Sequence, residues 1–470
     1  MLDYISTRRR DDVVKNFEEV VLEGLAADGG LYVPAACPVI TPDDMHSMRN
    51  VPYTGIAHRV IQPFTEGCID SDALYRIIDK AYKNFDHPEI APLVPVEKGL
   101  YVMELFHGPT LAFKDMALQF LGHLFDHILQ KRDNKLTIVG ATSGDTGSAA
   151  IEACRDKDTM DVFMLHPKDR VSEVQRRQMT TVLSPNIHNI AIEGSFDDCQ
   201  DLVKALFADK AFRREKNLSA VNSINWGRIV AQIAYYVYAY LKLSAEKGTE
   251  NIVFAVPTGN FGNIYAGYVA SSMGVPVKKL LIGTNSNDIL FRFLESGTMK
   301  TETVVPTTSP SMDIQISSNF ERVLFDLYGR DGEAVTGTMQ YFRSKGPFAL
   351  DEAMMTRLRE IFSAYRFDDS ATKEIMRRLH NQSGYIADPH TAIGIGAAEK
   401  YIWNSPLAAT DAVVALATAH PAKFPEAVED ATGHFPTLPA RLAGLHRQEE
   451  LLTVLPNDLQ QLKAFIREQK

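Results

Sequence analysis

The feature that most constrains the fold is the regular alternation of short apolar strands with helices. Each predicted strand is a continuous apolar run rich in β-branched residues, as at 136–141, 252–256 and 412–417. Runs of this kind are typical of parallel sheets that helices cover on both faces. The sequence therefore predicts an α/β protein, and its 470 residues are enough for two or three domains.

Composition and charge narrow the class of protein. Hydrophobic residues make up 45% of the chain and charged residues 23%, which is ordinary for a globular protein. The net charge is −10 and the basic residues form no long run, so nucleic acid is not an expected partner. No apolar run approaches the roughly 20 residues that a membrane span requires.

The cysteines and the N-terminal residues bear on location. The four cysteines are far apart in the sequence and form no Cys-x-x-Cys pair, which argues against a zinc site or a disulfide framework. Reduced thiols are typical of a cytoplasmic protein. Asp11 and Asp12 argue against an N-terminal transit peptide. We therefore expect a cytoplasmic protein with no metal site and no membrane association.

A lysine at the start of an apolar helix is the first candidate for chemistry. Lys114 follows a Gly-Pro turn, and apolar residues recur after it at helical spacing as far as Ile128. Burial would favour the neutral amine and lower its pKa, as a Schiff-base lysine requires. A lysine that lays its stem along an apolar surface would give the same pattern, so this stretch alone leaves both interpretations open.

A small-residue loop follows the predicted strand at 136–141 and precedes a helix. Backbone N–H groups at such a junction, together with the helix dipole, attract an anion. A tight turn capped by Ser143 or Asp145 would look the same. The candidate anion-binding residues in this loop are Thr142, Ser143, Gly144, Asp145 and Thr146.

A second strand, loop and helix of the same design lie at 252–269. The two glycines of the loop would let the backbone approach a phosphate closely. The spacing is neither that of a Walker loop nor that of a dinucleotide fingerprint, so a nucleotide is not implied. The residues of this loop that we expect to bind a phosphate are Gly259, Asn260, Phe261, Gly262 and Asn263.

Hydrogen-bond donors gather ahead of a third helix, which we predict from residue 229 onward. Asn222, Ser223, Asn225 and Arg228 fall within seven residues, and donors at a helix start suit an anion. An amide cap with a surface arginine is the alternative interpretation.

Polar residues also follow the strand at 412–417. Thr418 and Lys423 lie where open α/β sheets place ligands, beyond the carboxyl end of a strand. His390 precedes another helix, and there we favour a capping histidine over an acid or base.

Four features together indicate one kind of cofactor. They are a lysine in apolar surroundings, two anion loops, a hydroxyl at a strand end, and the lack of a metal-ligand pattern. A phosphorylated aldehyde bound to Lys114 accounts for all four. The loop at 258–263 would then hold the cofactor phosphate, and the loop at 142–147 would hold a substrate carboxylate.

A resemblance to a known family agrees with this interpretation. Residues 107–115, His-Gly-Pro-Thr-Leu-Ala-Phe-Lys-Asp, resemble the lysine site of fold-type II pyridoxal-phosphate enzymes, and of class I threonine synthases in particular. The matching motifs run from Gly24 to Lys423, which is most of the chain. They keep the order found in that family: Lys114, residues 143–147, residues 259–263 and Thr418.

The resemblance implies a fold of the tryptophan synthase β type. Such a chain has two α/β domains, here with an N-terminal extension and a helical insertion. We predict an N-terminal domain at 1–95, a small substrate-carboxylate domain at 136–224, and a large cofactor-binding domain formed by 96–135 and 225–470, with the helical insertion at 300–380.

The resemblance also implies an activity. In that family pyridoxal 5'-phosphate supports a β,γ-replacement that converts O-phosphohomoserine and water to threonine and phosphate, the last step of threonine biosynthesis. Lys114 would hold the cofactor and then move the Cα and Cβ protons of the substrate. Thr418 would be the hydroxyl partner of the cofactor's ring nitrogen. Asn225, Arg228 and Lys423 are the candidates for binding the substrate phosphate.

Two other functions remain open at this point. A serine or threonine dehydratase of the same fold would need no second phosphate site, which would leave Asn225 and Arg228 without a role. A non-catalytic relative would be expected to have a damaged lysine site or phosphate loop, and both are intact here.

Overall fold

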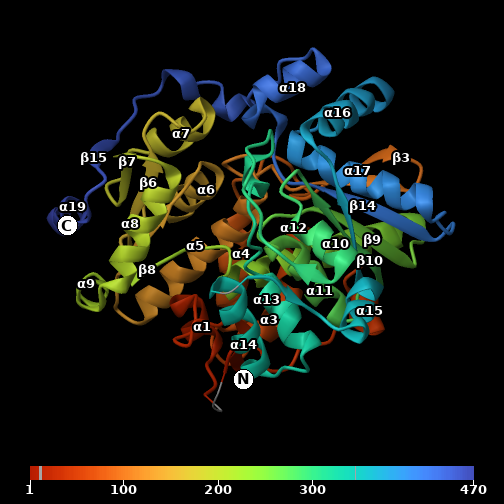
Figure 1. The fold of residues 1–470 in the computed structure, drawn as a ribbon, viewed down its shortest axis with the longest axis horizontal. Helices are drawn as coiled ribbons and strands as arrows, with labels where there is room; N and C mark the ends of the chain where they lie inside the picture. The colour runs from red at the N-terminus through yellow and green to blue at the C-terminus, as the bar shows by residue number, and fades with distance from the viewer. Residues whose placement is uncertain (10–12, 345, 470) are drawn as a thin grey trace.

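Two separate sheets organise the chain. The structure is a computed structural model that describes residues 1–9, 13–344 and 346–469, so Asp11 and Asp12 lie outside the described residues. In Figure 1 the small sheet lies at the left and the large sheet at the right, with the helices of the first half of the chain between them. The predicted α/β class is confirmed.

All strand pairs of the small sheet are parallel. Its strands, in spatial order, are β15 (Thr453–Pro456), β7 (Ile187–Glu193), β6 (Met160–Pro167), β5 (Leu136–Ala141) and β8 (Leu218–Ser219). The accompanying helices are α6 (Asp145–Cys154), α7 (Glu173–Thr180), α8 (Phe196–Ala208), α9 (Lys210–Glu215) and α19 (Leu459–Glu468).

The C-terminal segment corrects one of the predicted domain boundaries. We assigned 225–470 to the large domain, but β15 pairs with β7 and α19 packs its buried Leu462 and Ile466 into the core of the small sheet. The apolar side of α19 is therefore buried against the small sheet, although most of that sheet is formed by residues much earlier in the sequence.

The large sheet is parallel except at one edge. Its strands, in spatial order, are β13 (Phe362–Arg366), β10 (Val277–Thr284), β9 (Asn251–Pro257), β14 (Asp411–Ala417), β4 (Leu100–Glu104) and β3 (Leu93–Glu97). Strand β3 is antiparallel to β4, which the expectation of a parallel sheet did not include. On β9, Phe254 joins one hydrophobic core and Val253 joins the other, so the strand is buried on both faces. This double burial explains its continuous apolar sequence.

Helices cover both faces of the large sheet. They include α5 (Lys114–Lys131), α10 (Trp226–Lys247), α11 (Gly262–Ser272), α12 (Ile289–Ser296), α17 (Pro389–Asn404) and α18 (Pro425–Thr432). The short 3-10 turns η2 (Pro421–Lys423), η3 (Ala440–Leu442) and η4 (Leu445–Arg447) lead from β14 back toward the small sheet.

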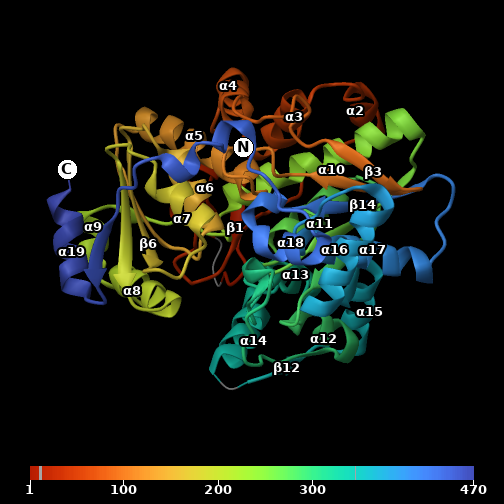
Figure 2. The ribbon, with the colours of Figure 1, turned by 90° about the horizontal axis from the view of Figure 1, so that it is seen from above.

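The N-terminal residues pack against the helices of the large sheet. They form β1 (Tyr4–Ser6), α1 (Phe17–Glu23), β2 (Tyr32–Pro34), α2 (Pro42–Ser47), α3 (Tyr53–Thr65) and α4 (Ser71–Tyr82). Helix α3 lies along α10, and α4 lies along α5. Figure 2 shows α3 and α4 on the side of the molecule opposite to α12, α14 and α15.

The segment at 300–380 is only partly helical. Its elements, together with the short strand before it, are β11 (Thr298–Met299), η1 (Pro310–Met312), α13 (Phe320–Leu327), α14 (Gly332–Ser344), β12 (Phe348–Ala349), α15 (Glu352–Ile361), β13 and α16 (Asp369–Ser383). The segment is therefore more than the helical insertion that we predicted. Its strand β13 extends the large sheet, and η1 approaches the carboxyl ends of the strands of that sheet.

The parallel order of the strands brings the candidate loops together. Strands β9 and β14 are parallel neighbours, so the loops that follow them leave the same edge of the sheet. A backbone hydrogen bond from the N–H of Phe113 to the carbonyl oxygen of Thr418, 2.8 Å long, ties the start of α5 to the end of β14. Lys114 and Thr418 are therefore held side by side.

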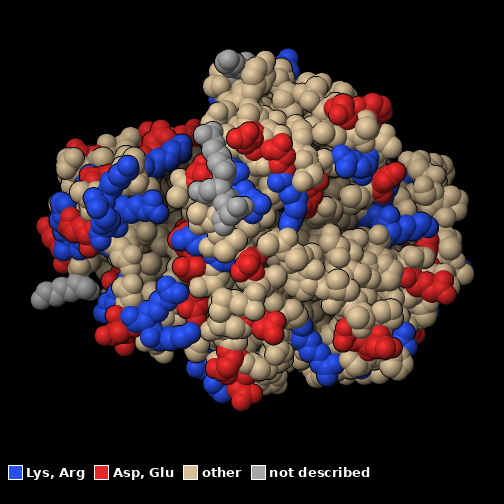
Figure 3. Space-filling view, turned by 90° about the horizontal axis from the view of Figure 1, so that it is seen from below, with Lys and Arg blue, Asp and Glu red and all other residues tan. Residues whose placement is uncertain are grey.

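The surface carries charges of both signs. On the face in Figure 3, basic and acidic side chains are interspersed. Within the part of the chain that the structure describes, no helix is long and apolar enough to cross a membrane.

Candidate functional site

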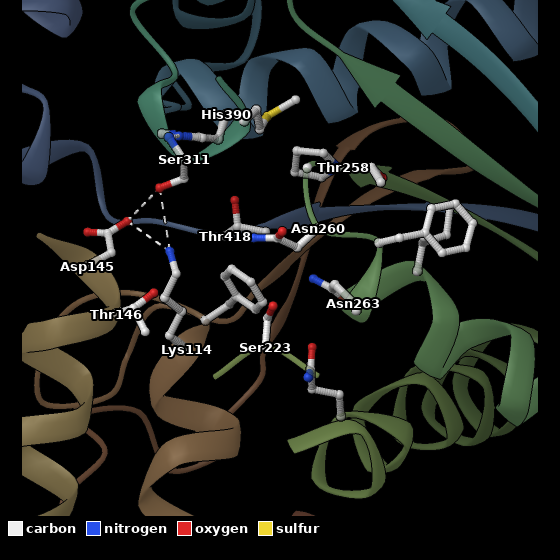
Figure 4. Close-up of a pocket in the computed structure, with 18 of the residues that line it drawn as sticks. Lys114, Asp145, Thr146, Ser223, Thr258, Asn260, Asn263, Ser311, His390 and Thr418 are labelled. Atoms are coloured by element: carbon white, nitrogen blue, oxygen red, sulfur yellow. Dashed lines mark hydrogen bonds and ion pairs between the residues drawn. The ribbon is translucent and has the colours of Figure 1, made fainter. Parts of the chain in front are cut away.

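A cavity opens between the small sheet and the large sheet, at the start of α5. It contains about 730 Å³ of space that no atom fills, part of which is open to solvent. Loops from both sheets and the η1 segment line it (Figure 4). The predicted residues among its lining are Lys114, Asp145, Thr146, Arg228, Gly259, Asn260, Phe261, Gly262, Asn263 and Thr418.

Lys114 is the first residue of α5 and points into this cavity (Figure 4). Its Nζ lies 3.1 Å from Oδ2 of Asp145 and 3.5 Å from Oγ of Ser311. Burial lowers the pKa of Lys114; the carboxylate of Asp145 opposes that shift, while the charge of Lys423 adds to it. The side chain is thus a largely buried amine whose charged form is destabilised, as the sequence predicted.

Asp145 is the first residue of α6 and binds four side chains. Its Oδ1 accepts a hydrogen bond from Nε2 of Gln175 at 2.8 Å and lies 2.9 Å from Nζ of Lys423. Its Oδ2 accepts from Lys114 and, at 3.1 Å, from Oγ of Ser311. Burial alone would raise the pKa of Asp145, but the two ammonium groups outweigh it and hold the pKa well below its usual range.

This arrangement changes the interpretation of the 142–147 loop. A charged carboxylate repels another carboxylate, so the side chain of Asp145 is not suited to bind an anion, and only the backbone N–H groups of the loop remain as candidates for this. Thr142 also has another role, because its Oγ1 accepts hydrogen bonds from the N–H groups of Gly144 and Gly147 and so shapes the loop. Ser143 is exposed, and of the five predicted residues only Asp145 and Thr146 line the cavity.

The second loop lines the cavity along its whole length. Its residues 258–263 end at the start of α11, whose N-terminus faces the open space. Gly259 is required by a close approach, since a Cβ there would lie 2.9 Å from the carbonyl oxygen of Ser311. Phe261 adopts a left-handed conformation with φ of 65° just before the helix begins. Backbone N–H groups and the helix dipole here suit an anion.

Asn263 adds a side-chain donor to this end of the cavity. Its Oδ1 accepts hydrogen bonds from the hydroxyls of Tyr235, at 2.5 Å, and Tyr236, at 2.8 Å. These two contacts fix which end of the amide faces the tyrosines. The Nδ2 atom of Asn263 is buried and has no partner among the described residues. In Figure 4 Asn263 lies across the cavity from Lys114.

Arg228 is a buried cation that lines the same end of the cavity. It is 4% exposed, and its Nε and Nη1 atoms make no hydrogen bond within the described part of the chain. Burial lowers its pKa to about 10, so the guanidinium is still charged at neutral pH. A buried charge without a partner is costly, and such a group is expected where an anionic ligand binds.

Asn225 is not part of this cavity, which corrects our prediction for it. Its Nδ2 donates to the carbonyl oxygen of Val21 at 2.8 Å, and its Oδ1 accepts from the N–H of Gly227 at 2.9 Å. The amide therefore caps α10 and joins it to α1. Both ends of the side chain make structural contacts, and Asn225 is not among the residues that line the cavity.

Lys423 is also not a cavity residue. Its Nζ binds Asp145, donates to the carbonyl oxygen of Thr110 at 2.8 Å, and donates to Oε1 of Gln178 at 3.1 Å. Its side chain is fully buried, so the prediction that it contacts the substrate phosphate is wrong. Thr418, by contrast, is 6% exposed and lines the cavity beside Lys114.

The cavity lining also includes polar residues that were not predicted to belong to the site, among them Ser311 and His390. Ser311 is in η1 and contacts both Lys114 and Asp145. His390 follows Asp388, the N-cap of α17, and its Nδ1 lies 2.7 Å from Oδ2 of that carboxylate. The prediction of a capping histidine is wrong: Asp388 is the cap and accepts hydrogen bonds from the N–H groups of His390 and Thr391, while the ring of His390 lines the cavity. The sequence shows that His390 lies at the start of a helix, but not what its imidazole ring faces. It could therefore not distinguish a histidine that caps the helix from one that lines the cavity.

Three family descriptions match successive parts of the chain. Residues 3–82 match "Threonine synthase N terminus", residues 85–341 match "Pyridoxal-phosphate dependent enzyme", and residues 391–466 match "Threonine synthase, C-terminal".

Individual relatives are similar over nearly the whole chain. A threonine synthase from Pseudomonas aeruginosa is 51% identical, with 98% of this chain and 97% of that protein covered. A threonine synthase from Saccharomyces cerevisiae is 40% identical, with coverages of 98% and 93%. The crystal structure of a PLP-bound threonine synthase from Brucella melitensis matches with a TM-score of 0.96 at 47% identity, with coverages of 100% and 99%.

Proposed function

The chain belongs to the threonine synthase family, and we propose that it converts O-phosphohomoserine and water to threonine and phosphate. It is a pyridoxal-phosphate-dependent lyase that acts on a small-molecule substrate. The observation that carries the choice of substrate is the guanidinium of Arg228, whose Nε and Nη1 atoms have no partner within the described residues and which lines the same cavity as the buried amine of Lys114. We also propose a cytoplasmic location, which the four free cysteines support.

The residues present suit the cofactor. The amine of Lys114 faces the cavity, the N-terminus of α11 opens on it, and the Nδ2 of Asn263, which has no partner among the described residues, supplies a donor beside it. We propose that residues 258–263 hold the phosphate of the cofactor and that Thr418 faces its ring nitrogen. When bound, pyridoxal phosphate supplies an aldehyde for the lysine and a ring that accepts electrons from the substrate.

The substrate phosphate needs a site of its own. We propose that Arg228 binds it, because a guanidinium can donate two parallel hydrogen bonds to phosphate oxygens. Ser223 lines the cavity with Arg228 and is the neighbouring hydroxyl. The phosphate gains charge as it leaves, so a fixed cation contributes more to the transition state than to the bound substrate.

The proton transfers are assigned to Lys114. The neutral amine of Lys114 would take the proton from Cα, give that proton up, and only then take a second proton from Cβ, which it could return to the substrate. Asp145 and Ser311 hold the amine by hydrogen bonds of 3.1 Å and 3.5 Å. The N–H groups at the start of α6, near Thr146, are the proposed site for the substrate carboxylate.

The unpaired guanidinium also separates this proposal from its rivals. A dehydratase that acts on serine or threonine has no substrate phosphate, so it would leave the charge of Arg228 buried without a partner. A non-catalytic relative would have no reason to retain both the buried amine and the anion loop.

The function is tested by supplying O-phosphohomoserine to the purified holoenzyme. We expect phosphate and threonine to appear in equal amounts, as measured by a phosphate colour assay and amino-acid chromatography. L-serine and L-threonine are the comparison substrates, with 2-oxo acid formation as the readout. Faster formation of 2-oxo acids from these than of threonine from O-phosphohomoserine would favour the dehydratase.

The hydroxyls that orient Asn263 provide a test of the phosphate loop. In Tyr235→Phe, Asn263 loses one of the two contacts that fix its amide, so we expect cofactor affinity to fall about tenfold, the equivalent of one lost hydrogen bond. The double variant with Tyr236→Phe should bind more weakly still. The measurement is a titration of cofactor-free protein with pyridoxal phosphate, followed by absorbance.

Tyr82→Phe is the matched control for that titration. Its hydroxyl donates a buried hydrogen bond of 2.9 Å to the carbonyl oxygen of Met116, away from the cavity lining. This variant should lose stability without a change in cofactor affinity. Equal affinities in all the tyrosine variants would remove Asn263 from the proposed phosphate site.

A further inference from the structure

Lys423 occupies an unusual position for a lysine. Its side chain is fully buried, and its Nζ is shared among Asp145, the carbonyl oxygen of Thr110 and Oε1 of Gln178, at 2.9, 2.8 and 3.1 Å. These partners belong to α6, to the segment before α5 and to α7. The ammonium therefore links η2, which follows β14, with the helices α6 and α7 of the small sheet and with the segment before α5.

The carboxylate of Asp145 is divided between two lysines. Its Oδ1 faces Lys423 and its Oδ2 faces Lys114. Gln175 and Ser311 complete its hydrogen bonds, so the carboxylate has one fixed orientation. Neither lysine has this counter-charge to itself.

We infer that Lys423 is a positioning residue for Lys114, which acts by holding one oxygen of Asp145 and so prevents the carboxylate from serving Lys114 alone. The inference rests on the proposed role of Lys114 as the cofactor lysine and proton carrier. That role requires the amine to lose its proton readily. With Lys423 removed, Asp145 would be a full counter-ion for the ammonium of Lys114.

The direction of the effect follows from the charges around the pair. Arg228 from α10 and His390 from α17 also face this region, and Asp115 lies close to Lys423. Replacing Lys423 leaves Arg228 and His390 in place, but the charge of Lys423 lowers the pKa of Asp115, so that pKa rises when the charge is removed. The exchange removes one positive charge near Lys114 and strengthens its pairing with Asp145, and both changes raise the pKa of Lys114.

The test measures the titration of Lys114 directly in the full chain without cofactor. Trace acetylation with acetic anhydride, quantified at Lys114 by peptide mass spectrometry over a range of pH, reports the fraction of neutral amine. In Lys423→Met we expect the midpoint to move upward by about one pH unit, which corresponds to about tenfold slower labelling below the midpoint. An unchanged or lower midpoint in the folded variant would overturn the inference.

Two further variants keep the result interpretable. Lys463 lies in α19 and forms a comparable ion pair with Asp209, 2.6 Å long, outside the cavity, so Lys463→Met should leave the midpoint of Lys114 unchanged. Lys423→Gln, which retains a donor for Thr110, replaces the methionine variant if that fails to fold, and the same upward movement is expected. A midpoint that stays in place in folded Lys423→Gln would count against the inference equally.

A further variant tests whether Lys423 affects Lys114 through the carboxylate of Asp145. In an Asp145→Asn background, the exchange of Lys423 for methionine should have a smaller effect on the midpoint, because there is no carboxylate to redirect. A full-sized effect in that background would exclude the positioning role. Because this labelling uses neither cofactor nor substrate, its outcome is independent of whether O-phosphohomoserine proves to be the substrate.

Discussion

Replacing Lys114 with alanine is expected to stop threonine formation from O-phosphohomoserine. The amine is assigned both the cofactor bond and the proton transfers, so the loss in kcat should be on the order of 10⁴-fold or more. Lys114→Arg should fail as well, because a guanidinium stays protonated and cannot carry these protons. Rates of phosphate release and of threonine formation measure the effect.

Chemical labelling gives the same prediction a second measurement. Borohydride reduction of the holoenzyme should attach a pyridoxyl group to Lys114, and peptide mapping should find no such label in Lys114→Ala. Lys131 is a matched control at the other end of α5, where its Nζ binds Glu18 at 2.8 Å, and Lys131→Ala should retain activity and label. A label on a lysine other than Lys114 would refute the assignment.

Removal of Lys114 should affect stability far less than activity. In Lys114→Ala, Asp145 keeps Lys423, Gln175 and Ser311 as partners, so no carboxylate is left buried without a counter-charge. We therefore expect the variant to fold and to give a thermal transition near that of the parent. This separates a loss of chemistry from a loss of structure.

The sequence predicted features that depend on local pattern. Continuous apolar runs predicted the central strands β5, β9 and β14, because residues such as Val253 and Phe254 are buried on opposite faces of one strand. The start of α5 at Lys114 and the loop at 258–263 were predicted because turn residues, glycines and helical periodicity are all local signals.

Features set by distant partners were missed. Strand β15 is a short half-buried run, and only its pairing with β7, some 260 residues earlier, assigns it to the small sheet. Asn225 and Lys423 looked like ligands because their residue types suit an anion. The carbonyl oxygens and carboxylates that occupy them, such as those of Val21 and Asp145, come from other segments.

Replacing Arg228 is the second large effect that we expect. In Arg228→Met, kcat/KM for O-phosphohomoserine should fall by about 10²–10³-fold, the size found when a group that stabilises a growing charge is removed. Arg228→Lys should retain part of the binding and lose more of the rate, because an ammonium cannot form the paired contact with phosphate. Steady-state kinetics of the two variants separate these contributions.

Arg322 provides a matched comparison, since it is also a fully buried arginine on a helix. Its guanidinium donates to the carbonyl oxygens of Tyr32, at 3.0 Å, and Ile224, at 2.7 Å, and it also binds Asn319. Arg322→Met would leave these carbonyl groups without a donor and should lower the free energy of unfolding by about 1–3 kcal/mol. The same change at Arg228 breaks no hydrogen bond of Nε or Nη1 within the described residues, so stability should be unchanged or higher.

The two arginines should therefore respond in opposite ways to substitution and to added anion. Inorganic phosphate should raise the melting temperature of the parent, because a ligand that binds only the folded state stabilises it. That increase should be smaller in Arg228→Met, whereas Arg322→Met should melt earlier than the parent and keep the full increase. If Arg228→Met instead loses stability and retains near-normal kinetics, then its guanidinium is structural, the substrate phosphate binds elsewhere, and the dehydratase regains its place as an alternative.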